Sequence, residues 1–103
     1  MDKTIKQLWI KALRSGKYQQ GQTILRSLDN KFCCLGVLCD ILESNNWKRN
    51  HFYYAIRDNS ATLPDDTQDR CKIDRYSTGT LMQLNDREKA DFNQIADWIE
   101  TNL

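Results

Sequence analysis

The sequence has little of what most recognisable enzymes and membrane proteins need. It contains one histidine, one proline and four glycines. No apolar run approaches the roughly 18–20 residues that cross a bilayer. A P-loop, a glycine-rich dinucleotide fingerprint and a His-Glu-x-x-His motif are all absent. An enzyme is therefore the less favoured class, and no membrane-spanning segment is expected.

The length and composition predict one folded domain. The 103 residues suffice for one hydrophobic core and are too few for two. An apolar content of 40% and a charged content of 28% are close to globular averages. We therefore expect residues 1–103 to form a single domain. Because residues 1–4 begin no apolar signal segment, we also expect the protein to stay in the cytoplasm where it is made.

The charge is balanced overall but unevenly distributed along the chain. The formal net charge is +1. Residues 1–50 hold nine Lys/Arg against four Asp/Glu, whereas residues 51–103 hold six against ten. This asymmetry could steer a charged partner to one face, or it could let the two halves attract each other within the fold. The near-zero total argues against a protein that binds duplex nucleic acid.

Both ends of the chain have helical periodicity. Residues 4–16 carry apolar side chains at helical spacing, with Asp2 or Thr4 as the cap and Gly16 at the end. Near the C-terminus, Ser77 or Thr78 is expected to cap a short helix. A second helix is predicted over 92–102. Asp91 and Gln94 have the spacing of a capping box at its start, and its apolar stripe consists of Phe92, Ile95, Ala96 and Ile99.

The middle of the chain has weaker signals. Residues 23–26 and 31–35 flank a turn at Asp29-Asn30 and predict a β-hairpin, which Gly36 ends. A short buried helix over 37–44 follows. Trp47 and residues 52–56 favour strands, and 60–66 reads as a turn into an extended piece. The predicted class is α+β, with an N-terminal helix, a β-hairpin, a buried short helix, an irregular or strand-forming middle and one or two C-terminal helices.

The four cysteines favour packing over chemistry. A zinc site from Cys34, Cys39, His51 and Cys71 has enough ligands, but lacks the paired spacing of a zinc knuckle. Neighbouring Cys33 and Cys34 are expected on a strand and would point to opposite faces. Buried, reduced thiols are the favoured interpretation. A catalytic Cys–His pair with His51, the sole imidazole, stays open as an alternative.

Two polar segments remain as candidate sites. The carboxylates of Asp65, Asp66 and Asp69 could hold a divalent cation, although a solvated acidic loop is favoured. The loop over 14–22 combines cationic, amide and aromatic side chains with two glycines, which suits an anionic ligand or a partner. Its alternative role is purely structural. The candidate binding residues are Arg14, Lys17, Tyr18, Gln20 and Arg26.

A resemblance covers nearly the whole chain. Its most specific part is Phe32-Cys33-Cys34-Leu35-Gly36-Val37-Leu38-Cys39-Asp40, and Trp9, residues 12–18, Leu84-Asn85-Asp86 and residues 92–99 extend it. In these residues the chain resembles an uncharacterised family of small accessory proteins of tailed bacteriophages. Relatives often have a glycine in the turn over 86–91, where this chain has Arg87-Glu88-Lys89-Ala90. That departure predicts that the last two helices run together.

The resemblance implies a setting and leaves the activity open. A phage accessory protein without a strong catalytic motif is expected to bind a host or defence protein in the host cytoplasm. One alternative is a protein that sequesters an anionic small molecule such as a nucleotide, through Arg14, Lys17, Tyr18 and Arg26. A nucleic-acid-binding protein is a further alternative. No cofactor is expected.

Overall fold

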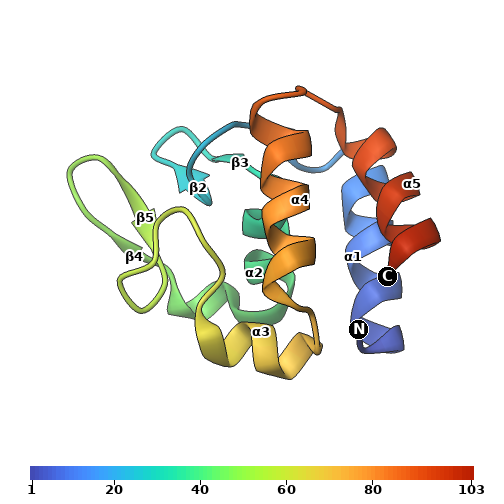
Figure 1. Ribbon diagram of the computed structural model, residues 1–103. Coiled ribbons are helices and arrows are strands. Elements are labelled where there is room, and N and C mark those ends of the chain that lie inside the picture. The colour runs from blue at the N-terminus through green and yellow to red at the C-terminus, as the bar shows by residue number, and fades with distance from the viewer.

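Helices from both ends of the chain pack together on one side of the molecule, and a small sheet lies on the other side (Figure 1). The computed structural model describes all residues, 1–103. The N-terminal half contains α1 (Lys3–Arg14), β1 (Gln19–Gln20), β2 (Arg26–Ser27), β3 (Lys31–Phe32), α2 (Cys34–Glu43) and a 3₁₀ turn, η1 (Ser44–Asn46). The C-terminal half contains β4 (Lys48–Arg49), β5 (Tyr53–Ala55), α3 (Asp65–Cys71), α4 (Arg75–Asp86) and α5 (Phe92–Asn102). The predicted α+β class is confirmed.

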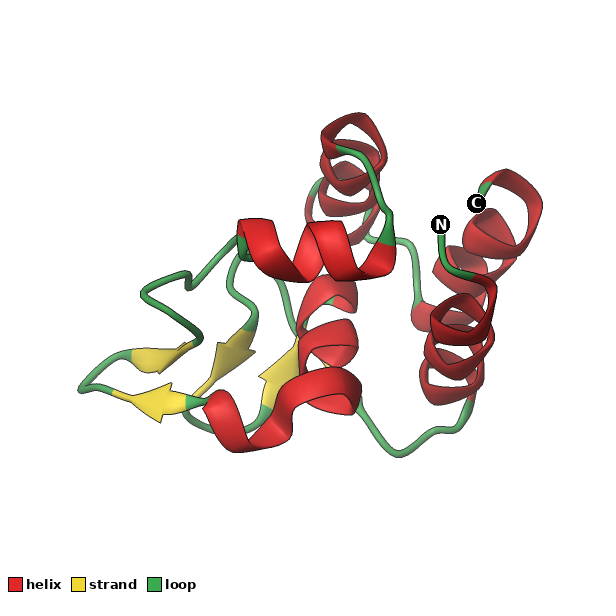
Figure 2. Cartoon of the chain, turned by 90° about the horizontal axis from the view of Figure 1, so that it is seen from below, coloured by secondary structure: helices red, strands yellow, loops and turns green.

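The helices and the sheet occupy opposite ends of the molecule. Helices α1 and α5 lie side by side, and the β4–β5 hairpin projects at the far end (Figures 1 and 2). Helix α2 lies between them, and its first six residues, Cys34–Cys39, are all buried. Twenty buried residues form one core cluster around it. No helix is long and apolar enough to cross a membrane.

The first helix forms as its sequence predicts. The Asp2 carboxylate accepts a hydrogen bond from the Ile5 N–H at 2.8 Å and so satisfies one of the free donors of the first turn. Gly16 follows the helix with a φ of 75°, the left-handed conformation that glycine adopts without strain. The side chains of Trp9, Ile10 and Leu13 are buried.

The sheet is broader than predicted, and its strands are shorter. Its order is β1-β3-β2-β5-β4. The predicted hairpin is present as β2 and β3, which pair antiparallel with Arg26 opposite Phe32. Strand β1 pairs parallel to β3, although its residues were predicted to be a loop. Two-residue strands leave no room for the alternating pattern by which sequence reveals a strand.

The prediction that Cys33 and Cys34 lie on a strand is wrong, as is the prediction that Gly36 ends one. Strand β3 stops at Phe32, Cys33 caps α2, and Gly36 lies within the helix. A Cβ at position 36 would lie 1.8 Å from the Leu25 carbonyl oxygen. Position 36 requires glycine because α2 packs directly on the backbone of Leu25, in the loop before β2.

Two further boundaries differ from prediction. Residues Asp65 and Asp66 do not form an acidic loop, because they are the first turn of α3. Carboxylates are favourable there, since they face the positive end of the helix dipole. Helix α4 begins earlier than expected. Its cap is Asp74, whose carboxylate accepts from the Ser77 N–H at 2.6 Å.

The last two helices remain separate, so the prediction that they run together is also wrong. Helix α4 ends at Asp86, and Lys89 adopts a φ of 51° in the turn, without glycine. The predicted capping box of α5 is confirmed. The Asp91 carboxylate accepts from the Gln94 N–H at 2.8 Å, and the Gln94 side chain accepts from the Asp91 N–H at 2.9 Å.

Candidate functional site

The residues predicted to bind an anion do not converge on one point. The Arg14 guanidinium forms ion pairs with Asp97 at 2.6 Å and Glu100 at 2.8 Å, which tie α1 to α5. Lys17 is exposed, and its ammonium makes no ion pair. The Gln20 amide donates to Asn85 Oδ1 at 2.9 Å and to the Ala90 carbonyl at 2.8 Å. Two of the five residues therefore hold the fold together.

The other two predicted residues meet in a group that we call the aromatic cluster: Tyr18, Arg26, Phe32, Trp47 and Tyr54. The Arg26 guanidinium lies 3.8 Å from the Tyr54 ring centroid and 5.5 Å from those of Phe32 and Trp47. Such cation–π contacts are favourable because the ring faces carry negative charge. The Tyr18 ring packs edge-on against Phe32, with centroids 5.1 Å apart.

Asp40, on α2, joins the aromatic cluster to the helical core. Its carboxylate accepts from the Tyr18 hydroxyl at 2.6 Å and from Trp47 Nε1 at 3.0 Å. Burial, followed by the hydrogen bond to Asp40, raises the pKa of Tyr18 well above its usual value. Tyr18 therefore stays a neutral donor at physiological pH. Because Trp47 precedes β4 and Tyr54 lies on β5, the cluster holds the base of the β4–β5 hairpin firmly.

We call residues 47–54 the hairpin surface. At its tip, Asn50 Oδ1 accepts from the N–H groups of Phe52 at 2.8 Å and Tyr53 at 2.9 Å, which fixes the turn. The Phe52 side chain is nevertheless 79% exposed. Lys48, Arg49 and His51 are exposed beside it and form no ion pairs.

The hairpin surface was not among the predicted sites. Its sequence does carry a signal, since residues 44–57 contain no Asp or Glu while holding Lys48, Arg49, His51 and Arg57. The fold places Lys48, Arg49 and His51 together on one projecting hairpin, a grouping that the sequence alone does not indicate.

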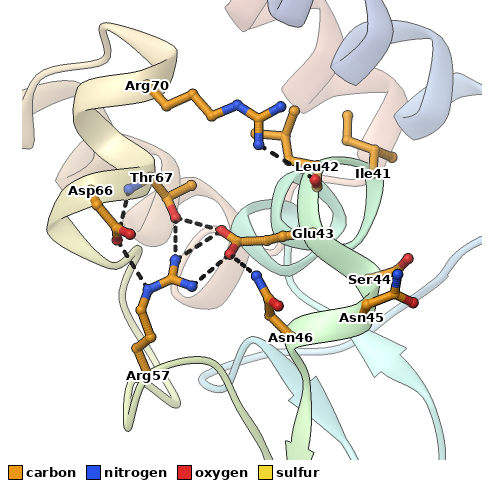
Figure 3. Close-up of a pocket in the computed structure, with 10 residues that line it drawn as sticks. All are labelled: Ile41, Leu42, Glu43, Ser44, Asn45, Asn46, Arg57, Asp66, Thr67 and Arg70. Carbon is orange, nitrogen blue, oxygen red and sulfur yellow. Dashed lines mark hydrogen bonds and ion pairs between the residues drawn. The ribbon is translucent and has the colours of Figure 1, made fainter.

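A polar cavity of about 480 Å³ lies where the end of α2 faces α3 (Figure 3). Its centre is the Glu43 carboxylate. Arg57 donates to both Glu43 oxygens, at 2.7 Å through Nη1 and 3.0 Å through Nη2. The Thr67 hydroxyl donates to it at 2.5 Å and the Asn46 amide at 2.9 Å. Arg57 Nε completes the network by donating to Asp66 at 3.1 Å.

This network links three segments of the chain: the end of α2, the loop after β5 and the start of α3. Burial alone would raise the pKa of Glu43, but the hydrogen bonds from Arg57, Thr67 and Asn46 outweigh it and lower the pKa to about 2. The hydrogen bonds to the ionised form therefore stabilise the fold. Because the Glu43 and Arg57 groups are occupied by one another, the cavity offers a ligand few free partners at its centre.

The Glu43 network predicts a loss of stability in acid. A carboxyl group whose pKa is lower in the folded than in the unfolded chain stabilises the fold above its unfolded pKa, and that contribution disappears as the pH falls toward the folded pKa. We expect the unfolding free energy to fall between pH 4.5 and about 2, by up to about 3 kcal/mol from this group. Urea denaturation across this range measures it. A Glu43→Gln variant that keeps the same acid-dependent loss would contradict the assignment.

The cysteines do not form a metal site. Cys33, Cys34, Cys39 and Cys71 are free and buried. Burial raises the pKa of every one, to about 11 for Cys33 and Cys71. His51 lies elsewhere, on the exposed hairpin next to Phe52. The four residues considered for zinc are thus not brought together, and no three His, Cys, Asp or Glu side chains cluster as metal ligands anywhere in the chain.

The acidic residues at the start of α3 pair with different arginines and do not converge on one site. Asp65 pairs with Arg75 at 3.2 Å and Asp66 pairs with Arg57 at 3.1 Å. Their carboxylates neutralise arginines of the same chain, so the cation site considered for this segment has no cluster of ligands behind it.

The fold and its surfaces define a small α+β protein with a projecting hairpin that carries an exposed Phe52 beside exposed Lys48, Arg49 and His51. The chain belongs to the family described as a domain of unknown function, DUF8296, whose sequence profile matches residues 1–103. No curated protein and no solved structure matches it.

Proposed function

We propose that this chain is a non-enzymatic binding protein, made by a bacteriophage in the host cytoplasm, that engages a host or defence protein through the hairpin surface. The resemblance of residues 32–40 to phage accessory proteins supplies the setting. The observation that carries the binding role is Phe52, a large apolar side chain left 79% exposed on a fixed turn.

The composition of the hairpin surface favours a protein partner. Aromatic and arginine side chains contribute most of the binding energy in protein interfaces. Phe52 and Arg49 are exposed on the hairpin, and Trp47, Tyr53 and Tyr54 are partly exposed. Nucleic-acid binders commonly neutralise about 6–10 phosphates. Lys48 and Arg49 are too few for that task, because Arg26 and Arg57 are already held within the chain.

The aromatic cluster prepares the hairpin for binding. A loop that is mobile when free loses conformational entropy when it binds, and this loss weakens the complex. Here Asp40 fixes Trp47, Arg26 stacks on Tyr54, and Asn50 fixes the turn. The hairpin is therefore held in one conformation before a partner arrives.

The anionic-ligand alternative has less support. This alternative requires Arg14, Lys17, Tyr18 and Arg26 to contact one ligand. Arg14, however, forms ion pairs with residues of α5, and Arg26 is stacked among aromatic rings. A nucleotide that nevertheless bound the folded state would raise the thermal midpoint of unfolding.

Capture from a bacterial host lysate, with the purified chain as bait, tests the proposal. We expect Phe52→Ser to reduce the captured host protein at least about tenfold, as loss of a central aromatic contact does. Tyr76→Ser is the matched control, because Tyr76 is 84% exposed on α4, away from the hairpin. Both variants should keep the wild-type unfolding midpoint. Equal capture by wild type and Phe52→Ser would contradict the proposal.

A further inference from the structure

Strand β4 forms an open edge of the sheet. The order β1-β3-β2-β5-β4 places β5 on one side of β4 and nothing on the other. The β4–β5 hairpin projects from the body of the molecule (Figure 2). An open edge presents unpaired N–H and C=O groups, to which another extended chain can bond.

The register of the hairpin shows which backbone groups are free. The Asn50 N–H donates to the Tyr53 carbonyl at 3.0 Å, so residues 50 and 53 form a hydrogen-bonded pair. In an antiparallel ladder such pairs alternate with pairs that do not bond to each other. Arg49, which lies opposite Tyr54, is therefore a non-bonded position. Its N–H and C=O point away from β5, toward the open edge.

The charge beside this edge is positive and unneutralised. Lys48 and Arg49 are exposed and form no ion pairs, and residues 44–57 contain no Asp or Glu. The one carboxylate that lines a hollow beside this edge, Asp58, is outnumbered by Lys48, Arg49 and Arg57. Cations on an edge strand disfavour pairing with a second copy of the same edge, because like charges would then lie opposite each other. The same cations attract carboxylates. The edge thus selects against self-association and for an acidic chain.

Two hollows adjoin the edge. One of about 400 Å³ is lined by the end of η1, by Trp47, Lys48 and Ala55, and by Arg57 and Asp58 after β5. The other, also of about 400 Å³, is lined by Arg49, Asn50 and His51. Peptides that add a strand to a sheet gain affinity from backbone hydrogen bonds and specificity from side chains placed alternately in such hollows.

We propose that an extended, acidic segment of the protein partner pairs with the free edge of β4 as an additional strand. Its backbone bonds to the N–H and C=O of Arg49, and its carboxylates lie beside Lys48 and Arg49. The inference rests on the proposed function and specifies the chemistry of the partner and the way it docks.

The test uses a displayed library of random peptides, selected on the full chain at low salt. We expect the enriched peptides to carry Asp or Glu at alternate positions. Two variants then separate backbone pairing from charge. Arg49→Ala removes the side chain and keeps the N–H, whereas Arg49→Pro removes both. Proline is tolerated where an edge-strand N–H faces solvent, so both variants should fold.

The expected result is a graded loss of affinity. Arg49→Ala should weaken an enriched peptide by about twofold to fivefold, as loss of an exposed charge does. Arg49→Pro should weaken it a further tenfold or so, since a backbone hydrogen bond is lost and its acceptor is left without a donor. Both variants should retain the wild-type unfolding midpoint.

Three results would overturn the inference. They are equal affinities for Arg49→Ala and Arg49→Pro, enriched peptides without an acidic pattern, and displacement of the peptides by oligothymidine that itself binds more tightly. If the host protein is captured equally by wild type and Arg49→Pro but not by Phe52→Ser, the edge inference fails while the binding function stands.

Discussion

Replacing Gly36 by alanine should destabilise the protein by more than about 4 kcal/mol, a large part of the roughly 5–15 kcal/mol that stabilises an ordinary domain. A Cβ there would lie 1.8 Å from the Leu25 carbonyl oxygen and 2.7 Å from the Leu25 carbonyl carbon. Neither partner can move away easily. Gly36 lies inside the buried part of α2, and the Leu25 N–H and C=O are bonded to Ser60 and Cys33.

Gly79→Ala is the matched control for this substitution. Gly79 lies within α4, and a Cβ there would meet nothing within 4 Å. Alanine should therefore stabilise that helix by about 0.5–1 kcal/mol, because it restricts the unfolded chain more than glycine does. Urea denaturation followed by circular dichroism compares the two variants. A Gly36→Ala protein as stable as wild type would refute the close packing of α2 on the Leu25 backbone.

Replacing Asn85 by aspartate is the second change with a large expected effect. Asn85 is fully buried. Its Oδ1 accepts from the Gln20 amide at 2.9 Å and the Cys34 N–H at 3.2 Å. Its Nδ2 donates to the Gly21 carbonyl at 2.9 Å and to the Asp86 carboxylate at 2.8 Å. The amide thus connects the loop of β1 and the start of α2 to α4.

Aspartate would reverse half of this arrangement. An oxygen in place of Nδ2 would face two acceptors, one of them charged, and the carboxylate would be buried. We expect a loss of about 3–5 kcal/mol in the free energy of unfolding. Asn93→Asp makes the same chemical change at an exposed position of α5 and should change stability by less than about 0.5 kcal/mol. Similar midpoints for the two variants would contradict the role assigned to Asn85.

Local signals account for the parts of the fold that sequence alone predicted. The Asp2 cap, the left-handed Gly16 and the Asp91–Gln94 capping box each involve residues three or fewer positions from a helix end. Their hydrogen bonds form within one turn, so the sequence contains both partners side by side. The same is true of the turn between β2 and β3.

Long-range contacts account for what the sequence could not reveal. The local pattern at Gly36 predicts a strand end, whereas the contact that requires glycine there is with Leu25, in the loop before β2. Arg14 and Gln20 read as solvent-facing ligands because Asp97 and Asn85, which bind them, are far away in the chain. The open edge of β4 exists only through the strand order, which no local pattern encodes.

We propose that a host protein binds the β4–β5 hairpin, and site-specific photocrosslinking in infected cells tests this proposal most directly. A photoreactive phenylalanine analogue at Phe52 replaces one exposed aromatic side chain by another, and the same analogue at Tyr76 is the control. We expect one host-protein adduct from position 52 and none from position 76. An adduct from position 76 alone, or from neither position, would contradict it.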